Sequence, residues 1–138
     1  MRTLETLIRV QKRQLDQLRR ELAGLEQLAI DLRQQAADLE TEVVQQQGLA
    51  RTTAEGAFAY PGYARTVIAR RGKVAASIAD VDVRVAAMRE RVAESFQELK
   101  RYDIVLSNRR LQARIEADRR EQLLLDEMGL EAHRRRHA

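Results

Sequence analysis

The chain has 138 residues, of which 33% are charged, 4% are aromatic and none is cysteine. This composition is typical of long helices and coiled coils, and it excludes disulfides and thiolate metal sites. Its 25 basic and 21 acidic residues are interspersed and leave a net charge of +4, which indicates an ion-paired helix surface first and an anionic partner second. No apolar run is long enough to span a membrane, and the first residues lack the apolar core of a signal peptide, so we expect a cytoplasmic protein.

A heptad repeat runs through the first third of the chain. Between Leu4 and Ala50 every a position is apolar and five of the seven d positions are Leu, which predicts a coiled-coil seam. Thr3 is expected to cap this helix, which should extend over about 3–55. The a positions are Ile8, Leu15, Leu22, Ala29, Ala36, Val43 and Ala50, and the d positions are Leu4, Gln11, Leu18, Leu25, Leu32, Leu39 and Gln46.

The strongest helix breaker in the chain lies between residues 56 and 62. Pro61 lacks an amide hydrogen and disfavours helix at Tyr60, while Gly56 and Gly62 supply turn conformations. The sequence therefore predicts a non-helical hinge over 56–62 at which the chain reverses its direction.

A second heptad repeat begins at Val67 and predicts a helix over about 63–128. Its d positions are Val67, Val74, Val81, Met88, Ser95, Tyr102 and Arg109, and its a positions are Arg71, Ile78, Val85, Val92, Leu99, Leu106 and Ala113. The two repeats are compatible with an antiparallel hairpin, in which an a layer of one helix faces a d layer of the other. The fold is therefore predicted to be all-α, an antiparallel two-helix coiled-coil hairpin with a longer, overhanging C-terminal helix.

The register of this hairpin depends on the position of the turn. The pairing that centres the turn between Gly56 and Pro61 satisfies every layer and sets Val43 opposite Val74. A displacement by one heptad preserves the same pattern but moves the turn, so periodicity alone leaves the register open.

The second helix is expected to extend roughly fifteen residues beyond the first, at about 1.5 Å per residue. In this overhang the apolar residues leave the seam, which indicates either an interaction surface or a stutter in the supercoil. Gly129 is predicted to end the helix, leaving a basic tail over 129–138. The overhang residues predicted to bind another molecule are Ile115, Leu123, Leu124 and Leu125.

The motifs of catalysis are missing from the sequence. It contains no Gly-rich phosphate loop and no nucleophile elbow, and its carboxylates alternate with arginines on predicted helix faces. His133 and His137 are four residues apart in the predicted tail but have no third ligand nearby. We therefore expect no enzyme activity, no cofactor and no metal.

Nucleic acids and membranes are also unexpected partners. The arginines near the open end are interleaved with acids and have no aromatic stacking platform, and the hinge argues against a basic zipper. The apolar stripe is too narrow for a membrane-surface helix. The remaining interpretation is a rod whose ends contact other proteins.

Four segments resemble the FliJ family, the soluble coiled-coil components of the flagellar type III export apparatus. They are TLIRVQKRQLDQLRREL (6–22), FAYPGYARTVIARR (58–71), FQELKRYD (96–103) and REQLLLDEMGL (120–130). The resemblance implies a hairpin similar to the central stalk of rotary ATPases, with three partners: the hexameric export ATPase, the membrane export gate and the export chaperones. It also implies a cytoplasmic location, peripheral to the flagellar base at the inner membrane.

Two surfaces are predicted to carry these contacts. The open end is predicted to bind the ATPase through Arg9, Lys12, Arg13, Arg109, Arg110 and Arg114. The hinge end of the second helix is predicted to bind the export gate through Tyr63, Ile68 and Arg70, which are expected off the seam. The competing hypothesis is a generic coiled-coil adaptor or spacer that dimerises through the overhang.

Overall fold

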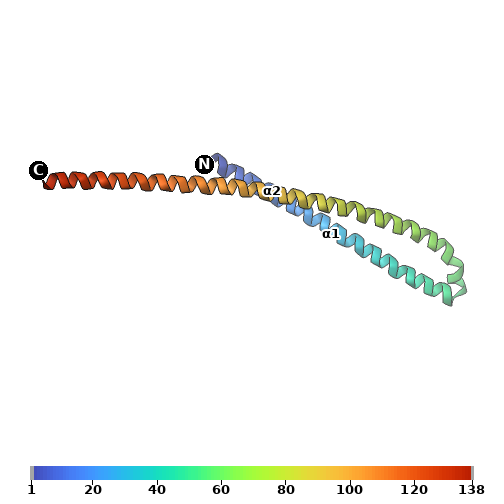
Figure 1. Ribbon diagram of the computed structural model, residues 1–138. Helices are drawn as coiled ribbons and strands as arrows, with labels where there is room; N and C mark the ends of the chain where they lie inside the picture. Colours follow the sequence, from blue (N-terminus) through green and yellow to red (C-terminus); the bar gives the residue numbers. More distant parts are fainter. Residues whose placement is uncertain (1, 138) are drawn as a thin grey trace. The chain divides into compact units, whose positions relative to one another are not determined.

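The computed structural model describes residues 2–137, which contain two helices and no strand. Helix α1 spans Arg2–Thr52 and helix α2 spans Ala54–Arg136, as Figure 1 shows. The prediction of an all-α helical hairpin is confirmed. The chain forms two compact units: a hairpin unit, Leu15–Glu94, and a terminal unit that combines the first fourteen residues with those from Ser95 onward.

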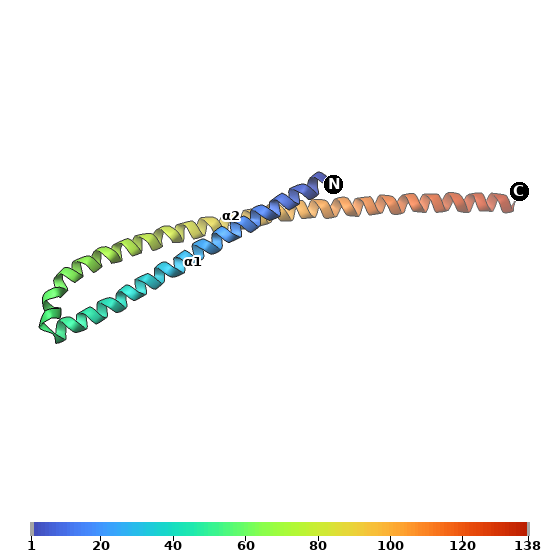
Figure 2. The same cartoon turned by 180° about the vertical axis from the view of Figure 1, so that it is seen from behind.

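In the hairpin unit the two helices run antiparallel and side by side, as both views show (Figures 1 and 2). Every predicted a and d position from 15 to 50 and from 67 to 92 is buried or half-buried. Burying this stripe supplies most of the stability of such helices, because helix propensity alone is weak. The heptad assignment is therefore confirmed here.

The register differs from the predicted one by a heptad. Val67 belongs to a buried cluster with Leu39 and Val43, whereas the predicted pairing set Val43 opposite Val74. Farther from the turn, Val81 clusters with Ala29 in the same displaced register. The predicted pairing is wrong because the chain turns earlier than Pro61 indicates.

The turn lies at Thr53, the one residue between α1 and α2. Its hydroxyl accepts a hydrogen bond from the Gly56 amide at 2.9 Å, and its carbonyl accepts one from the Ala57 amide at 3.1 Å. This is the geometry of a helix N-cap. The Thr53 amide and hydroxyl both donate to the Leu49 carbonyl at 2.9 Å, so one threonine closes α1 and opens α2.

The predicted non-helical hinge over 56–62 is wrong, because these residues form the opening turns of α2. Pro61 lies inside the helix and cannot donate a hydrogen bond to the carbonyl of Ala57. The opening turns cross from the end of α1, and α2 then bends back along α1 (Figure 1). Proline thus bends the chain at the tip of the hairpin while the threonine cap separates the helices.

In the terminal unit, the start of α1 packs against α2 between residues 95 and 106. Leu4 and Ile8 are buried on α1, and Leu99 and Leu106 are buried on α2. Gln11 donates a hydrogen bond to the Ser95 hydroxyl at 3.1 Å, which satisfies a polar pair within the apolar seam. The seam assignment is confirmed as far as Leu106.

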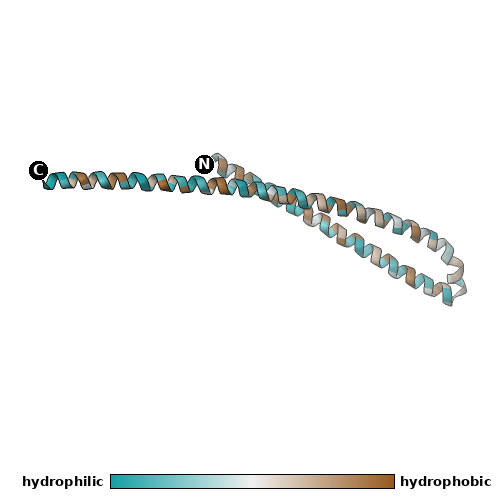
Figure 3. Ribbon diagram, in the orientation of Figure 1, coloured by the Kyte–Doolittle hydropathy of each residue, from teal (hydrophilic) through white to brown (hydrophobic). Residues whose placement is uncertain are grey.

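Beyond that point the overhang is longer than predicted and fully helical. Every residue from 107 to 137 is exposed, including the predicted seam positions Arg109 and Ala113, because the displaced register shifts α1 toward the hinge. Gly129 does not end the helix, which continues to Arg136. An isolated glycine costs a helix only about 1 kcal/mol, and strong helix formers follow it. Figure 3 shows apolar and hydrophilic residues alternating along this segment.

Candidate interaction surfaces

The six cations predicted at the open end all belong to the terminal unit and are all exposed. Arg110 forms an ion pair with Glu5 at 3.3 Å, which sets the alignment of the two helices there. Arg9 and Arg13 are therefore one to two turns inward from this pair, about 6 to 12 Å along α1.

This spacing divides the predicted basic patch into two groups. Arg9, Lys12 and Arg13 accompany the packed part of α2, whereas Arg109, Arg110 and Arg114 lie where α1 begins and α2 extends past it, with Arg110 paired to Glu5. Among residues 2–137, no carboxylate forms an ion pair with Arg109 or Arg114. Arg109 and Arg114 therefore present their charges on an exposed face of α2, where they can meet an acidic partner at little desolvation cost.

At the hinge end, Tyr63 is part of the core. It packs against the cluster of Leu39, Val43 and Val67, and its hydroxyl is buried without a hydrogen-bond partner among the described residues. Burial raises the pKa of the Tyr63 phenol, and the nearby Glu42 carboxylate raises it further. The expectation that Tyr63 lies off the seam is wrong, because its side chain packs against apolar residues of both helices.

The other two residues predicted at the hinge are exposed. Ile68 is 65% exposed, and Arg70 forms an ion pair with Glu42 at 3.6 Å. Next to them Arg71 donates two hydrogen bonds to Glu40 at 2.7 Å. Bonding to Glu40 raises the pKa of the Arg71 guanidinium, so Arg71 fastens the two helices together and Ile68 is left available.

Phe58, which was not among the predicted contact residues, is 90% exposed at the hairpin tip. The predicted non-helical hinge over 56–62 includes Phe58, whereas the structure places it on the first turns of α2. The sequence feature that could have singled out Phe58 is its residue type, since the whole chain contains only two Phe. A nearly fully exposed aromatic at a turn is typical of a contact residue rather than a core residue.

The four overhang residues are exposed, at 42% for Ile115 and 54–61% for the three leucines. Consecutive residues of a helix point about 100° apart, so Leu123, Leu124 and Leu125 cannot face one partner together. Residues four apart share a face, which groups Ile115 with Leu111 and Leu124 with Met128. The overhang therefore offers two separate apolar strips, and not one continuous seam.

Two kinds of site were compared with the described residues: a metal centre with three or more ligands and a membrane-spanning helix. Within residues 2–137 there is no group of three or more His, Cys, Asp or Glu side chains arranged to hold a metal. Neither described helix contains a stretch long and apolar enough to cross a bilayer. The surfaces available for function are the exposed ends of the two units.

The family described as flagellar FliJ protein matches the chain over residues 1–138, its whole length. The chain belongs to the FliJ family. No curated protein and no solved structure matches the chain in the corresponding comparisons. Family membership identifies this FliJ-family protein as a component related to flagellar protein export, which agrees with the resemblance of its sequence segments.

Proposed function

We infer that this FliJ-family protein is a non-catalytic coiled-coil stalk of the flagellar type III export apparatus. In this proposal its open end binds the hexameric export ATPase, its hinge end binds the membrane export gate, and the export chaperones are further partners. The observation that carries the proposal is that α2 continues alone and exposed from residue 107 to 136. An unpartnered helix of this length with exposed leucines favours a bound partner, because such a helix gains little stability by itself.

The ATPase contact is assigned to the second group of cations, on the exposed part of α2. Simultaneous reversal of Arg109, Arg110 and Arg114 to Glu should abolish stimulation of the ATPase. Reversal of the first group, Arg9, Lys12 and Arg13, should weaken stimulation less, because that group lies inward of the overhang.

A matched control reverses three exposed cations of the hairpin unit, Arg65, Lys73 and Arg91. This variant undergoes the same change of net charge but should stimulate the ATPase normally. Circular dichroism should show unchanged helicity in all three variants. Unchanged stimulation by the variant with Arg109, Arg110 and Arg114 reversed would reject the assignment.

The gate contact is assigned to the hinge end around Ile68. An Ile68→Asp variant should lose binding to the purified gate domain, since it places a charge on an exposed apolar side chain. Val83→Asp is the matched control, because Val83 is 70% exposed on the same helix and lies outside the hinge. Normal gate binding by Ile68→Asp, with intact helicity, contradicts this assignment.

The alternative function is a coiled-coil adaptor that dimerises through the overhang. The exposed strip of Leu124 and Met128 favours it, because a second copy could cover these side chains. Light scattering on the purified chain separates the hypotheses: a monomer that binds the ATPase supports the stalk, and a constitutive dimer that truncation after Ala113 converts to a monomer supports the adaptor.

A further inference from the structure

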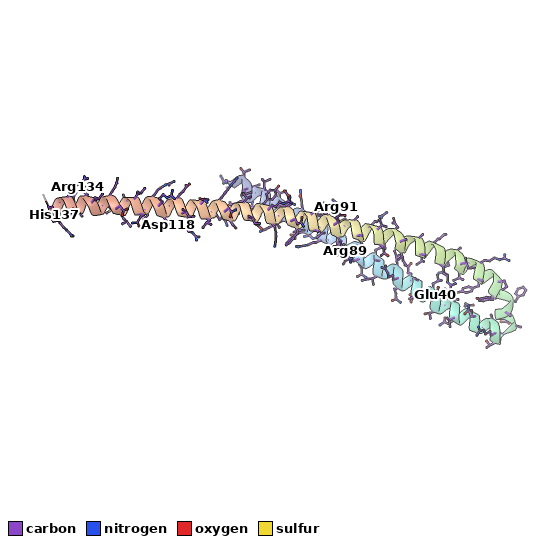
Figure 4. All side chains as sticks on the ribbon, viewed as in Figure 1. Glu40, Arg89, Arg91, Asp118, Arg134 and His137 are labelled. Carbon is purple, nitrogen blue, oxygen red and sulfur yellow. The ribbon has the colours of Figure 1, made fainter. Side chains whose placement is uncertain are left out.

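Two histidines share one face at the carboxyl end of α2. His133 and His137 are four residues apart, a spacing that places side chains one above the other on a helix. Their ring centroids are 4.3 Å apart, with the ring planes inclined at 55°. The His137 amide donates to the His133 carbonyl at 3.2 Å, so helical geometry extends to the second ring. Both side chains are exposed, and the last turns project into solvent (Figure 4).

The distance between the rings suits a shared metal ion. Imidazole nitrogens bind Zn²⁺ at about 2.0–2.1 Å, so two donors to one ion lie within about 4 Å of each other. Each ring nitrogen is on the perimeter of its ring, and rotation of the exposed side chains can bring a nitrogen of each ring toward the same point. Two histidines at this helical spacing already hold zinc in metalloprotease helices.

The electrostatics of the site contain opposing contributions. The last carbonyl groups of a helix carry partial negative charge, which favours a bound cation at this end. Three arginines, Arg134, Arg135 and Arg136, intervene and repel a cation, although Arg135 forms an ion pair with Glu131 at 3.5 Å. At about 100° per residue Arg135 points away from the histidine face, and Arg134 and Arg136 lie on either side of it, so the two imidazoles are the groups that face the ion.

We propose that His133 and His137 form a bidentate site for a divalent late transition metal, Cu²⁺, Ni²⁺ or Zn²⁺. Neutral imidazole suits these ions, and Cu²⁺ should bind most tightly. Because two ligands leave coordination positions open, the bound ion holds water there or a donor from another molecule. The ion also ties together the last turn of α2, so occupancy increases helix content at this end.

The test uses the full-length chain without an affinity tag. Isothermal titration with Zn²⁺ and with Ni²⁺ should show one site per chain. His133→Ala should weaken binding by more than about tenfold, because losing a ligand should cost at least as much as losing an outer-shell partner. Copper-bound protein should show two nitrogen ligands by electron paramagnetic resonance.

A variant of identical composition separates a helical clamp from two independent histidines. The double substitution Arg135→His/His137→Arg keeps two histidines but places them two residues apart, about 200° around the helix. This variant should bind as weakly as His133→Ala, with normal helicity in the absence of metal. Wild-type affinity in this variant, or a single nitrogen ligand on copper, would overturn the proposal.

Discussion

Replacing Gly56 with alanine should destabilise the hairpin, although alanine is the better helix former. A Cβ atom at Gly56 would press against the Leu49 carbonyl oxygen, with 2.6 Å to the Leu49 carbonyl carbon and 2.7 Å to Thr53 Oγ1. The Leu49 groups belong to the backbone of α1 and also receive the hydrogen bonds of Thr53. The turn must therefore shift to admit a methyl group.

The magnitude follows from two opposing contributions. Overpacking of this kind costs about 1–3 kcal/mol, and the gain in helix propensity offsets up to about 1 kcal/mol of it. Gly24 is the matched control, because a Cβ there meets nothing within 4 Å. Gly24→Ala should stabilise the chain by roughly 0.5–1 kcal/mol, so the two variants should differ by about 2 kcal/mol.

Urea unfolding followed by circular dichroism at 222 nm measures this difference. With a slope of about 1–3 kcal/mol per molar urea, the midpoints of the two variants should differ by roughly 1 M, with wild type between them. If Gly56→Ala raised the midpoint as much as Gly24→Ala, the close approach of α2 to Leu49 would not exist, and the Thr53 turn would be wrong.

Three further predictions concern the hairpin unit. Tyr63→Phe should leave the urea midpoint unchanged or raise it, because the lost hydroxyl is buried without a partner. Since burial raises the pKa of Tyr63, ionisation of this phenol should lower stability only as the pH rises above its usual range, and Tyr63→Phe should reduce that alkaline fall. Arg33 and Asp82, joined by two hydrogen bonds of 2.7 and 2.8 Å, should show a coupling energy of about 0.2–1 kcal/mol in a double-mutant cycle of alanine variants, falling with added salt; zero coupling at low salt would contradict the pairing. A short thiol cross-linker should join cysteines introduced at 43 and 67, whose native side chains share a buried cluster, more efficiently than cysteines at 43 and 74, which the displaced register separates by about 10 Å more; the reverse preference would restore the register inferred from the sequence.

Several features followed from local pattern. The seam was readable because a heptad repeat places its apolar residues on one face whatever partner covers them, and every predicted seam position up to Leu106 is at least half-buried. The exposure of Ile68 and of the overhang leucines followed for the same reason, since these residues fall outside the stripe.

The position of the turn required the tertiary structure. Pro61 is the stronger breaker in sequence, yet it is accommodated as a bend within α2, while Thr53 caps the helix through hydrogen bonds to Gly56 and Ala57. The bonds of this cap are local in sequence, but a threonine also fits inside a helix, as Thr52 does at the end of α1. Packing of the seam therefore selects which residue ends the helix, and propensity could not reveal it. The inward position of the Tyr63 ring has the same origin.

The register also required the tertiary structure, because a seven-residue repeat matches itself after every displacement of seven residues. Within the hairpin unit, one alignment brings Val67 to Leu39 and Val43 and joins Arg71 to Glu40. Ion pairs across the seam and the cap at Thr53 distinguish alignments that the apolar pattern leaves equal. Periodicity therefore determines which face of each helix is buried, and only the contacts between the folded helices determine which residues meet there.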